Sequence, residues 1–244
     1  MISLIQITDP HLTGSKKTKV KECSTHASFE KIVAYIKANE SPDFIVTSGD
    51  ISNDGTKKSY IAYQKGIEHF KQPVFTILGN HDNHKNFHTI FGKVFPPVEK
   101  ITLSETWLMI AIDSTSMNKE SGYITQQQIH SLRKLIENNR DKCLIICLHH
   151  QPIKMGFWID EVGLENSDNF ISSISNQSNI KAIIWGHVHY ESESTLGSIK
   201  MLSTPSTCYQ FCENKEKPDT NKPGYRKINL FHSGKIESTV VRID

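Results

Sequence analysis

The sequence has no long hydrophobic run, few cysteines and almost no excess charge. No segment approaches the roughly 20 apolar residues of a membrane-spanning helix, so we expect neither a membrane partner nor a signal peptide. The formal net charge is only +2, which argues against nucleic acid as an obligate partner. No linker, internal repeat or low-complexity tract divides residues 1–244, and we interpret them as a single domain.

Five cysteines are too few and too scattered for a disulfide framework. Their number is odd and none stands in a C-x-x-C pair, which is typical of proteins from a reducing compartment. We therefore predict a cytoplasmic protein in which all five thiols are free. The five are Cys23, Cys143, Cys147, Cys208 and Cys212.

Hydrophobic patterning predicts an α/β chain. Short apolar runs predict buried strands over Ile2–Thr8, Asp43–Ser48, Val74–Leu78, Cys143–Leu148 and Ile180–Trp185. Apolar residues at helical spacing predict helices over Phe29–Ile36, Tyr60–Phe70, Asn83–Phe91 and Ile129–Ile136, the last capped by Thr125. Further strands are expected as an antiparallel hairpin at Lys100–Leu103 and Trp107–Ile112, and at Thr195–Ser203, Ser206–Phe211, Arg226–Phe231 and Lys235–Val241.

Polar side chains follow each of the five buried strands at the point where the strand ends. In open α/β sheets, ligands bind beyond the carboxyl ends of the strands. One such group alone is usually only a turn, and for Asp9-Pro10-His11 a turn with a surface histidine is the commoner outcome. Five in succession, three of them preceded directly by glycine, favour a site. They are Asp9 and His11, Asp50, Asn80 and His81, His149, and His187 and His189.

Oxygen and imidazole side chains of this kind suit first-row ions such as iron, manganese, cobalt or zinc. Even seven of these eight side chains are too many ligands for one tetrahedral ion. They fit two ions that share a bridging carboxylate, and pairs of ions roughly 3.5–4 Å apart act on phosphate esters. The sequence therefore predicts two divalent transition metal ions.

The combined pattern D-x-H, G-D, G-N-H-D, H and G-H-x-H resembles the calcineurin-like metallophosphoesterases, and the resemblance runs from Asp9 to His189. It implies a four-layer α/β/β/α sandwich. By analogy, one ion takes Asp9, His11, Asp50 and His189, and the other takes Asp50, Asn80, His149 and His187, so that Asp50 bridges. In the family motif this histidine ligand stands three residues before a proline. Here the proline is Pro152, so the resemblance favours His149 over His150 as the ligand. His81 remains as the candidate catalytic acid, with Asn80, His81 and His189 also expected to touch substrate.

Further stretches narrow the resemblance to the bacterial class III cyclic nucleotide phosphodiesterases. They are Gly49–Gly55, Trp158–Asp160 with Leu164–Asn166, Pro205–Phe211 and Pro223–Arg226, whereas Gln151 departs from the usual His or Pro. This resemblance implies a small-molecule cyclic nucleotide substrate, and it is compatible with a homodimer. We expect iron or manganese first, with zinc or cobalt also fitting, and in-line attack by a metal-bound hydroxide while His81 assists the leaving alkoxide.

Two alternatives to a cyclic nucleotide phosphodiesterase stay open. The same site could serve a glycerophosphodiesterase or a phosphodiesterase of broad specificity. A scaffold without catalysis is disfavoured because every motif residue is retained. The segment Gln151–Asn166 leaves the expected site and is rich in aromatic residues. It could form a substrate wall or a loop packed by its own aromatics.

Overall fold

The computed structural model describes residues 1–211 and 218–244. Its helices are α1 (Thr25–Asn39), α2 (Lys57–Ile67), α3 (His84–Phe91), α4 (Gln126–Glu137) and α5 (Ser167–Ile174), with short 3-10 helices η1 (Trp158–Val162) and η2 (Pro218–Asn221). Its strands are β1 (Ile2–Ile7), β2 (Phe44–Ser48), β3 (Val74–Ile77), β4 (Val98–Thr102), β5 (Trp107–Ile112), β6 (Cys143–Cys147), β7 (Ile180–Trp185), β8 (Ser192–Leu196), β9 (Ile199–Ser203), β10 (Gly224–Leu230) and β11 (Ile236–Arg242).

The strands form two mixed sheets. One has the order β11-β10-β1-β2-β3 and the other β4-β5-β6-β7-β9-β8. Strands β1, β2 and β3 are parallel, as are β5, β6, β7 and β9. The antiparallel pairing of β4 with β5 confirms the predicted hairpin. Because parallel strands point the same way, their carboxyl ends lie along one edge of each sheet.

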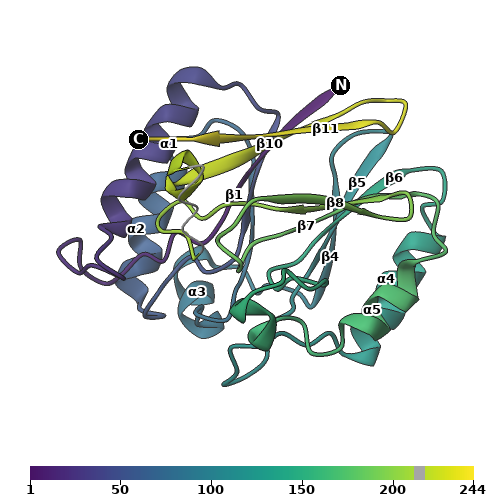
Figure 1. Cartoon of the computed structure of the whole chain (residues 1–244), viewed down its shortest axis with the longest axis horizontal. Helices are drawn as coiled ribbons and strands as arrows, with labels where there is room; N and C mark the ends of the chain where they lie inside the picture. The colour runs from purple at the N-terminus through teal and green to yellow at the C-terminus, as the bar shows by residue number, and fades with distance from the viewer. Residues whose placement is uncertain (212–217) are drawn as a thin grey trace.

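The two sheets pack face to face with helices outside them, as Figure 1 shows for α1 and α2 on one side and α4 and α5 on the other. Strand β6 illustrates why. Its Ile145 and Cys147 join the core of the first sheet, whereas the alternate residues Leu144 and Ile146 pack in the cluster beneath α4. A strand whose side chains are all apolar is stable only when other elements cover both faces of its sheet. The predicted four-layer α/β/β/α arrangement is confirmed.

The capping of α4 also follows the prediction. The Thr125 side chain accepts a hydrogen bond from the backbone N–H of Gln128, and the Gln128 side chain accepts one from the Thr125 backbone. This reciprocal capping box satisfies two N–H groups that a helix start otherwise leaves unpaired. It fixes where α4 begins, directly behind the second sheet.

Two predictions for the second half of the chain are wrong, and one helix was not predicted. The expected strand Thr195–Ser203 is a hairpin of β8 and β9, because Gly197 takes a φ of 59° and turns the chain. The expected strand Ser206–Phe211 is a loop, held by side-chain hydrogen bonds and by isolated backbone hydrogen bonds and not by a ladder. Helix α5 follows the Gln151–Asn166 segment, where no helix was expected.

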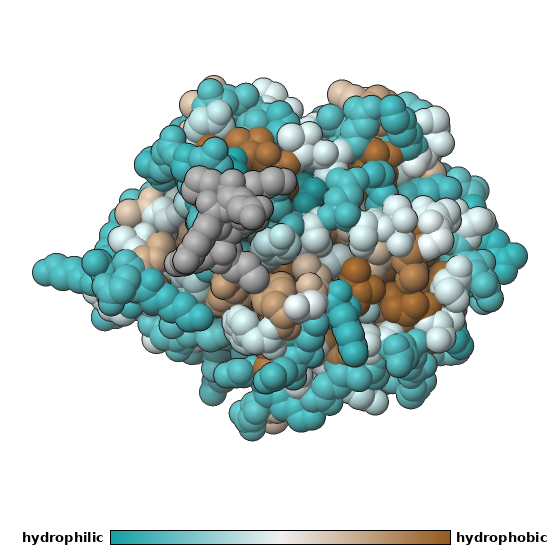
Figure 2. Space-filling view, viewed as in Figure 1, coloured by the Kyte–Doolittle hydropathy of each residue, from teal (hydrophilic) through white to brown (hydrophobic). Residues whose placement is uncertain are grey.

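The surface is mainly hydrophilic on the face that Figure 2 shows, with apolar areas of limited extent. Within the described residues, no helix is long and apolar enough to cross a bilayer. The four described cysteines, Cys23, Cys143, Cys147 and Cys208, are free. Cys212, the fifth thiol of the prediction, lies outside the described residues.

Candidate metal centre

The predicted metal-binding residues lie just beyond the carboxyl ends of β1, β2, β3, β6 and β7. Five of them have left-handed backbones, a conformation that residues other than glycine seldom adopt. The φ angles are 51° for Asp9, 44° for His11, 49° for Asp50, 64° for His187 and 44° for His189. Such strain costs on the order of 1–3 kcal/mol per residue and gathers at functional sites. The chain therefore bends sharply after β1, β2 and β7 and turns these five side chains inward.

Two glycines allow the strand ends to approach one another. A Cβ atom on Gly79 would overlap the carboxylate of Asp50, and one on Gly186 would overlap the side chain of Thr8. No side chain fits at either position without displacing these groups. The glycines that precede Asn80 and His187 are thus required by the close packing around the site.

Asp50 lies at the centre of the group. Its Oδ2 is 3.5 Å from His11 Nε2, and its Oδ1 is 3.4 Å from His149 Nε2. The backbone N–H of His81 donates to Oδ1 at 2.9 Å. One carboxylate therefore faces histidines from both sheets, as a bridging ligand must.

Asp9, His11 and His189 form one cluster beside Asp50. Asp9 Oδ1 is 3.4 Å from His189 Nε2, and the Nε2 atoms of His11 and His189 are 3.0 Å apart. Asp9 Oδ2 also accepts hydrogen bonds from Thr8 Oγ1 at 2.6 Å and from the backbone N–H of His187 at 3.0 Å. These bonds fix the carboxylate while its Oδ1 faces the imidazoles.

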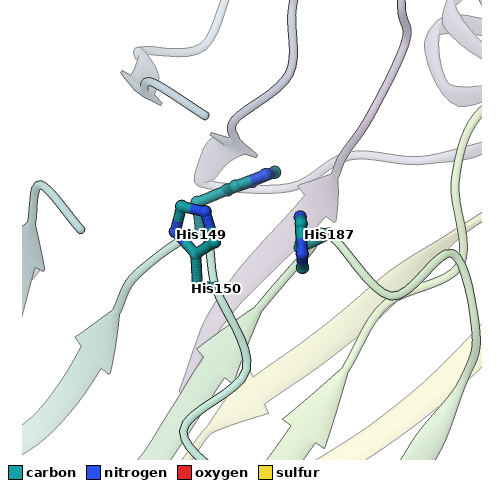
Figure 3. Close-up of side chains that lie close together, drawn as sticks. All are labelled: His149, His150 and His187. Carbon is teal, nitrogen blue, oxygen red and sulfur yellow. The ribbon is translucent and has the colours of Figure 1, made fainter. Parts of the chain in front are cut away.

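Asn80, His149 and His187 gather on the other side of Asp50. His149 Nε2 is 3.1 Å from Asn80 Oδ1. Figure 3 shows the rings of His149 and His187 approaching from the ends of two neighbouring strands, and their centroids are 5.0 Å apart. The structure thus brings all seven predicted ligands together around Asp50.

Backbone carbonyls orient three of the imidazoles. His149 Nδ1 lies 2.8 Å from Ser48 O, His189 Nδ1 lies 2.8 Å from Tyr209 O, and His187 Nε2 lies 3.1 Å from Val162 O. A carbonyl oxygen only accepts, so each of these nitrogens carries a proton, and the other ring nitrogen is the one that can face a metal ion. Carbonyl partners of this kind typically hold metal-binding histidines in place.

His150, the rejected alternative to His149, uses both of its ring nitrogens elsewhere. Nδ1 is 2.8 Å from Ser114 Oγ and Nε2 is 3.0 Å from Glu120 O. His150 still lies within a possible donor cluster with His149 and His187. Its hydrogen bonds tie the loop after β5 to the end of β6, so a structural role accounts for the ring.

The charge states of His11, His187 and Asp50 suit cation binding, whereas His149 must first lose a proton. Burial lowers the pKa of His11 to about 3 and that of His187 well below its ordinary value, so both rings are neutral at pH 7. Burial opposes the ionised form of Asp50, but His149 beside it holds the pKa of that carboxyl well below its usual range. Burial also opposes protonation of His149, but the Asp50 carboxylate raises the pKa of His149 to about 9.

The donor set fits divalent metal ions. The site concentrates buried acceptors and lone pairs, with two carboxylates and two facing imidazole nitrogens. His11 Nδ1 is buried and has no hydrogen-bond partner within residues 1–211 and 218–244. Buried acceptors that face one another need a cation or shared protons between them. Imidazole, carboxylate and amide oxygen together suit borderline first-row ions.

His81 lies at the exposed side of this group. Its ring is 4.8 Å from the His11 ring, and its Nδ1 is 3.2 Å from Asn53 O. Nδ1–H therefore donates to the carbonyl, which fixes the ring and leaves Nε2 available for another partner.

Asp82 is a residue whose role sequence reasoning missed, although it belongs to the G-N-H-D motif. Its carboxylate accepts hydrogen bonds from the backbone N–H groups of Gly79, Ile51 and Ser52, at 2.9, 3.1 and 3.0 Å. Tyr60 Oη donates to it at 3.1 Å. Asp82 thus clamps the loops after β2 and β3, which deliver Asp50 and Asn80.

The Gln151–Asn166 segment does not pack only on its own aromatics. Trp158 contacts Phe211 edge to face at 4.9 Å, and Phe157 contacts Tyr190 at 6.0 Å. Gln151 is buried, and its Nε2 donates to Ile159 O within the segment. The substrate-wall interpretation stays a prediction.

Residues 2–191 match the family model of the calcineurin-like phosphoesterases, and the chain belongs to this family. Among curated relatives, it is 31% identical over 250 residues to the 3',5'-cyclic adenosine monophosphate phosphodiesterase CpdA of Haemophilus influenzae, covering 100% of this chain and 90% of the relative. It is 27% identical to the protein of the same name in Escherichia coli K12, covering 99% and 90% of the two chains. Among solved structures, a dimetal phosphatase from Danio rerio aligns with a TM-score of 0.73 at 10% identity, covering 99% of this chain and 98% of that one, which shows the shared fold alone.

Proposed function

We propose that this protein is a phosphodiesterase that hydrolyses 3',5'-cyclic nucleotides, with cyclic AMP converted to AMP, at a centre of two divalent metal ions. The observation that carries the proposal is that Asp50 faces His11 and His149, with the other candidate ligands beside them. The names of relatives that align over nearly the whole chain support the substrate class.

The side chains divide into two sets that share Asp50. One ion would be held by Asp9, His11, Asp50 and His189, and the other by Asp50, Asn80, His149 and His187. The donor chemistry suits iron, manganese, zinc and cobalt, and the family resemblance puts iron or manganese first. When bound, such ions polarise a phosphate ester and supply a nucleophile from water at neutral pH.

The charge of the site supports a phosphodiester substrate. Asp9 and Asp50 contribute one negative charge each, and buried His11 and His187 are neutral. Two carboxylates do not neutralise two divalent ions, so the loaded site remains cationic. It attracts a phosphodiester monoanion and attracts the more negative transition state further.

His81 would assist the leaving alkoxide. Because Nδ1–H donates to the Asn53 carbonyl, proton delivery falls to Nε2, and this requires the doubly protonated ring. The backbone N–H of His81 also donates to Asp50, so the acid and the bridging carboxylate keep a fixed relation. A ribose 3'-oxygen is a poor leaving group and benefits from such a donor.

The proposal includes a cytoplasmic location, which agrees with four free thiols among the described residues. It includes a small-molecule substrate, with no need for nucleic acid or a membrane. A second copy of the chain in a homodimer is compatible with it.

A substrate panel tests the proposed function. Protein reconstituted with manganese or iron is assayed on 3',5'-cyclic AMP, 3',5'-cyclic GMP, 2',3'-cyclic AMP and a glycerophosphodiester. We expect the highest kcat/KM for a 3',5'-cyclic nucleotide. A preference for the glycerophosphodiester would replace the cyclic nucleotide by the alternative substrate. Absence of hydrolysis by metal-loaded protein on the whole panel would favour a scaffold.

A further inference from the structure

A series of aromatic rings leads from the metal centre to the surface. Phe211 stacks on His189, with ring centroids 4.0 Å apart and planes 11° from parallel. Tyr209 stacks on His11 at 5.6 Å. Trp158 contacts the Phe211 ring at 4.9 Å, and 51% of its surface is exposed. We call Trp158, Tyr209, Phe211 and Lys21 the aromatic rim.

Lys21 places a cation over this group of rings. Its Nζ lies 4.6 Å from the ring centre of Phe211, 5.4 Å from that of Tyr209 and 5.9 Å from that of Trp158. Distances below about 6 Å are typical of cation–π attraction. His189 covers one face of Phe211, so the ammonium lies over the opposite face. The rim therefore holds a positive charge near the mouth of the site.

The turn that carries Lys21 is strained. Val20 and Cys23 exchange backbone hydrogen bonds of 3.0 and 2.9 Å, and between them Lys21 and Glu22 have φ angles of 46° and 61°. Two positive φ angles in a tight turn are ordinarily supplied by Asn or Gly. A lysine and a glutamate adopt this conformation only at an energetic cost. Strained backbones of this kind gather at functional sites, so the turn is consistent with a functional role for the position of the Lys21 ammonium.

A pocket of about 710 Å³ opens at the rim, and its lining includes Lys21, Cys23, Trp158, Tyr209, Gln210 and Phe211. This volume is in the range of small-molecule sites. The opposite wall of the metal centre borders a second hollow, of about 730 Å³, that includes Asn80 and His81. Among the described residues lining that second hollow, none is Phe, Tyr or Trp. The rim pocket thus offers aromatic rings for stacking, and the second hollow does not.

We propose that the aromatic rim binds the purine base of the substrate, with the base stacked on Trp158 and its ring nitrogens facing the Lys21 ammonium. This inference rests on the proposed function and adds where the base lies and which side chains select it. A purine has two π faces and several hydrogen-bond acceptors. The rings of the rim can stack on a π face, and the Lys21 ammonium can donate to the acceptors. The phosphate would then reach the metal centre past the stacked pairs of His189 with Phe211 and His11 with Tyr209.

The test compares two substrates that differ only in the base. One is 3',5'-cyclic AMP, and the other is the 3',5'-cyclic phosphate of methyl β-D-ribofuranoside, which has a methoxy group instead of adenine. Base–aromatic stacking contributes about 1–3 kcal/mol, which corresponds to about 5- to 150-fold in affinity. We expect Trp158→Ala to raise KM for cyclic AMP by a factor in this range. KM and kcat for the base-free substrate should stay unchanged.

Lys21→Met and Met117→Ala sharpen this comparison. Lys21→Met keeps an unbranched apolar side chain and loses the ammonium, so it should raise KM for cyclic AMP by a smaller factor. Met117 lies on the opposite wall and is 91% exposed, so Met117→Ala should change neither substrate. A raised KM for cyclic AMP in Met117→Ala alone would place the base on the opposite wall and overturn the inference.

A binding measurement gives a second readout. Trp107 and Trp185 are buried, which leaves Trp158 as the exposed tryptophan. Titration with AMP should quench the fluorescence of the metal-loaded protein, and Trp158→Phe should remove the quenching while keeping most of the affinity. Ribose 5-phosphate should bind without quenching.

The outcomes separate this inference from the proposed function. If the wild-type protein hydrolyses cyclic AMP but Trp158→Ala leaves its KM unchanged, the rim does not bind the base and the proposed function stands. Equal losses on both substrates in Trp158→Ala would also overturn the inference, because they indicate a general disturbance of the site. If the wild-type protein hydrolyses neither cyclic phosphate, the proposed function itself fails.

Discussion

The floor of the site is buried, apart from half-buried Asn80, and is held by the backbone, whereas the aromatic rim is half open to solvent and held by ring contacts. We use floor for the seven residues Asp9, His11, Asp50, Asn80, His149, His187 and His189. Three of its histidines are fixed by carbonyl oxygens from other segments. In the rim, Trp158 is 51% exposed, and its partners are the rings and one lysine.

Because the floor and the rim differ in burial and in how they are held, we expect them to determine different properties of the protein. A buried set of charged and neutral donors with fixed orientations tolerates little change, and it determines the chemistry. An exposed platform of rings can change without disturbing the ligands beneath it, and it determines which molecule is admitted. Substitutions in the floor should therefore affect metal and turnover, and substitutions in the rim should affect KM.

The largest effect is expected from Asp50→Ala in the floor. Because Asp50 faces both histidine groups, its loss should remove most of both ions and reduce hydrolysis to background. Elemental analysis and the cyclic AMP assay measure the two effects. Asp141→Ala is the matched control, because this carboxylate is exposed and pairs only with Lys142 among the described residues. Retention of both ions in Asp50→Ala would exclude the bridging role.

The next largest effect is expected from His81→Ala. The His81 ring contacts the His11 ring at the edge of the floor. General acid catalysis contributes about 10²–10⁴-fold, so turnover of cyclic AMP should fall by that factor with metal content unchanged. A bis-nitrophenyl phosphate has a good leaving group and should lose distinctly less. Equal losses on the two substrates would assign His81 to positioning, because positioning does not depend on the leaving group.

Metal binding by the floor should depend on pH. The pKa of His149 is raised to about 9 by Asp50 in the metal-free protein, so at pH 7 this ring carries a proton that a metal ion must displace. Affinity should therefore increase as pH rises from 7 towards 9, by up to about tenfold per unit for one released proton, and then flatten. Metal titrations at pH 7, 8 and 9 measure the slope. Affinity that stays constant over this range would contradict a protonated His149.

The smallest effect is expected from the Asp82 clamp beneath the floor. Tyr60→Phe removes one donor to Asp82 and leaves the Asn83 N–H without the Tyr60 oxygen, which accepts from it at 2.6 Å. This should lower the free energy of unfolding by about 1–3 kcal/mol. Asp82→Ala should cost more, because three backbone N–H groups lose their acceptor. Urea unfolding of both variants measures the two losses in the free energy of unfolding. A smaller loss for Asp82→Ala than for Tyr60→Phe would argue against the clamp.

The floor could be predicted from the sequence because each of its residues follows a strongly apolar strand. Runs such as Ile180–Trp185 have one stable arrangement, buried on both faces, and the residue after the run is then fixed in space. The structure brings His187 and Asp50 together from opposite sheets for this reason. Their assignment as ligands stays a prediction.

The region after His189 was less predictable. Thr195–Ser203 is apolar enough to suggest one strand, but Gly197 divides it into a hairpin. The loop of Ser206–Phe211 is fixed by long-range bonds, such as Ser206 Oγ to Asp9 O at 2.8 Å and Thr207 N to Thr8 O at 3.0 Å. The local sequence pattern does not indicate partners that are so far apart along the chain. The rim is built from this loop and from Trp158, so its proximity to His189 emerged only from the structure.

The number of ions per chain tests the central claim most directly. Protein stripped of metal, reconstituted with manganese or iron and freed of excess ion is analysed for metal and for protein concentration. The account predicts about two ions per chain, because the seven floor side chains form two sets that share Asp50. At most one ion per chain, in protein that hydrolyses cyclic AMP at full rate, would contradict it.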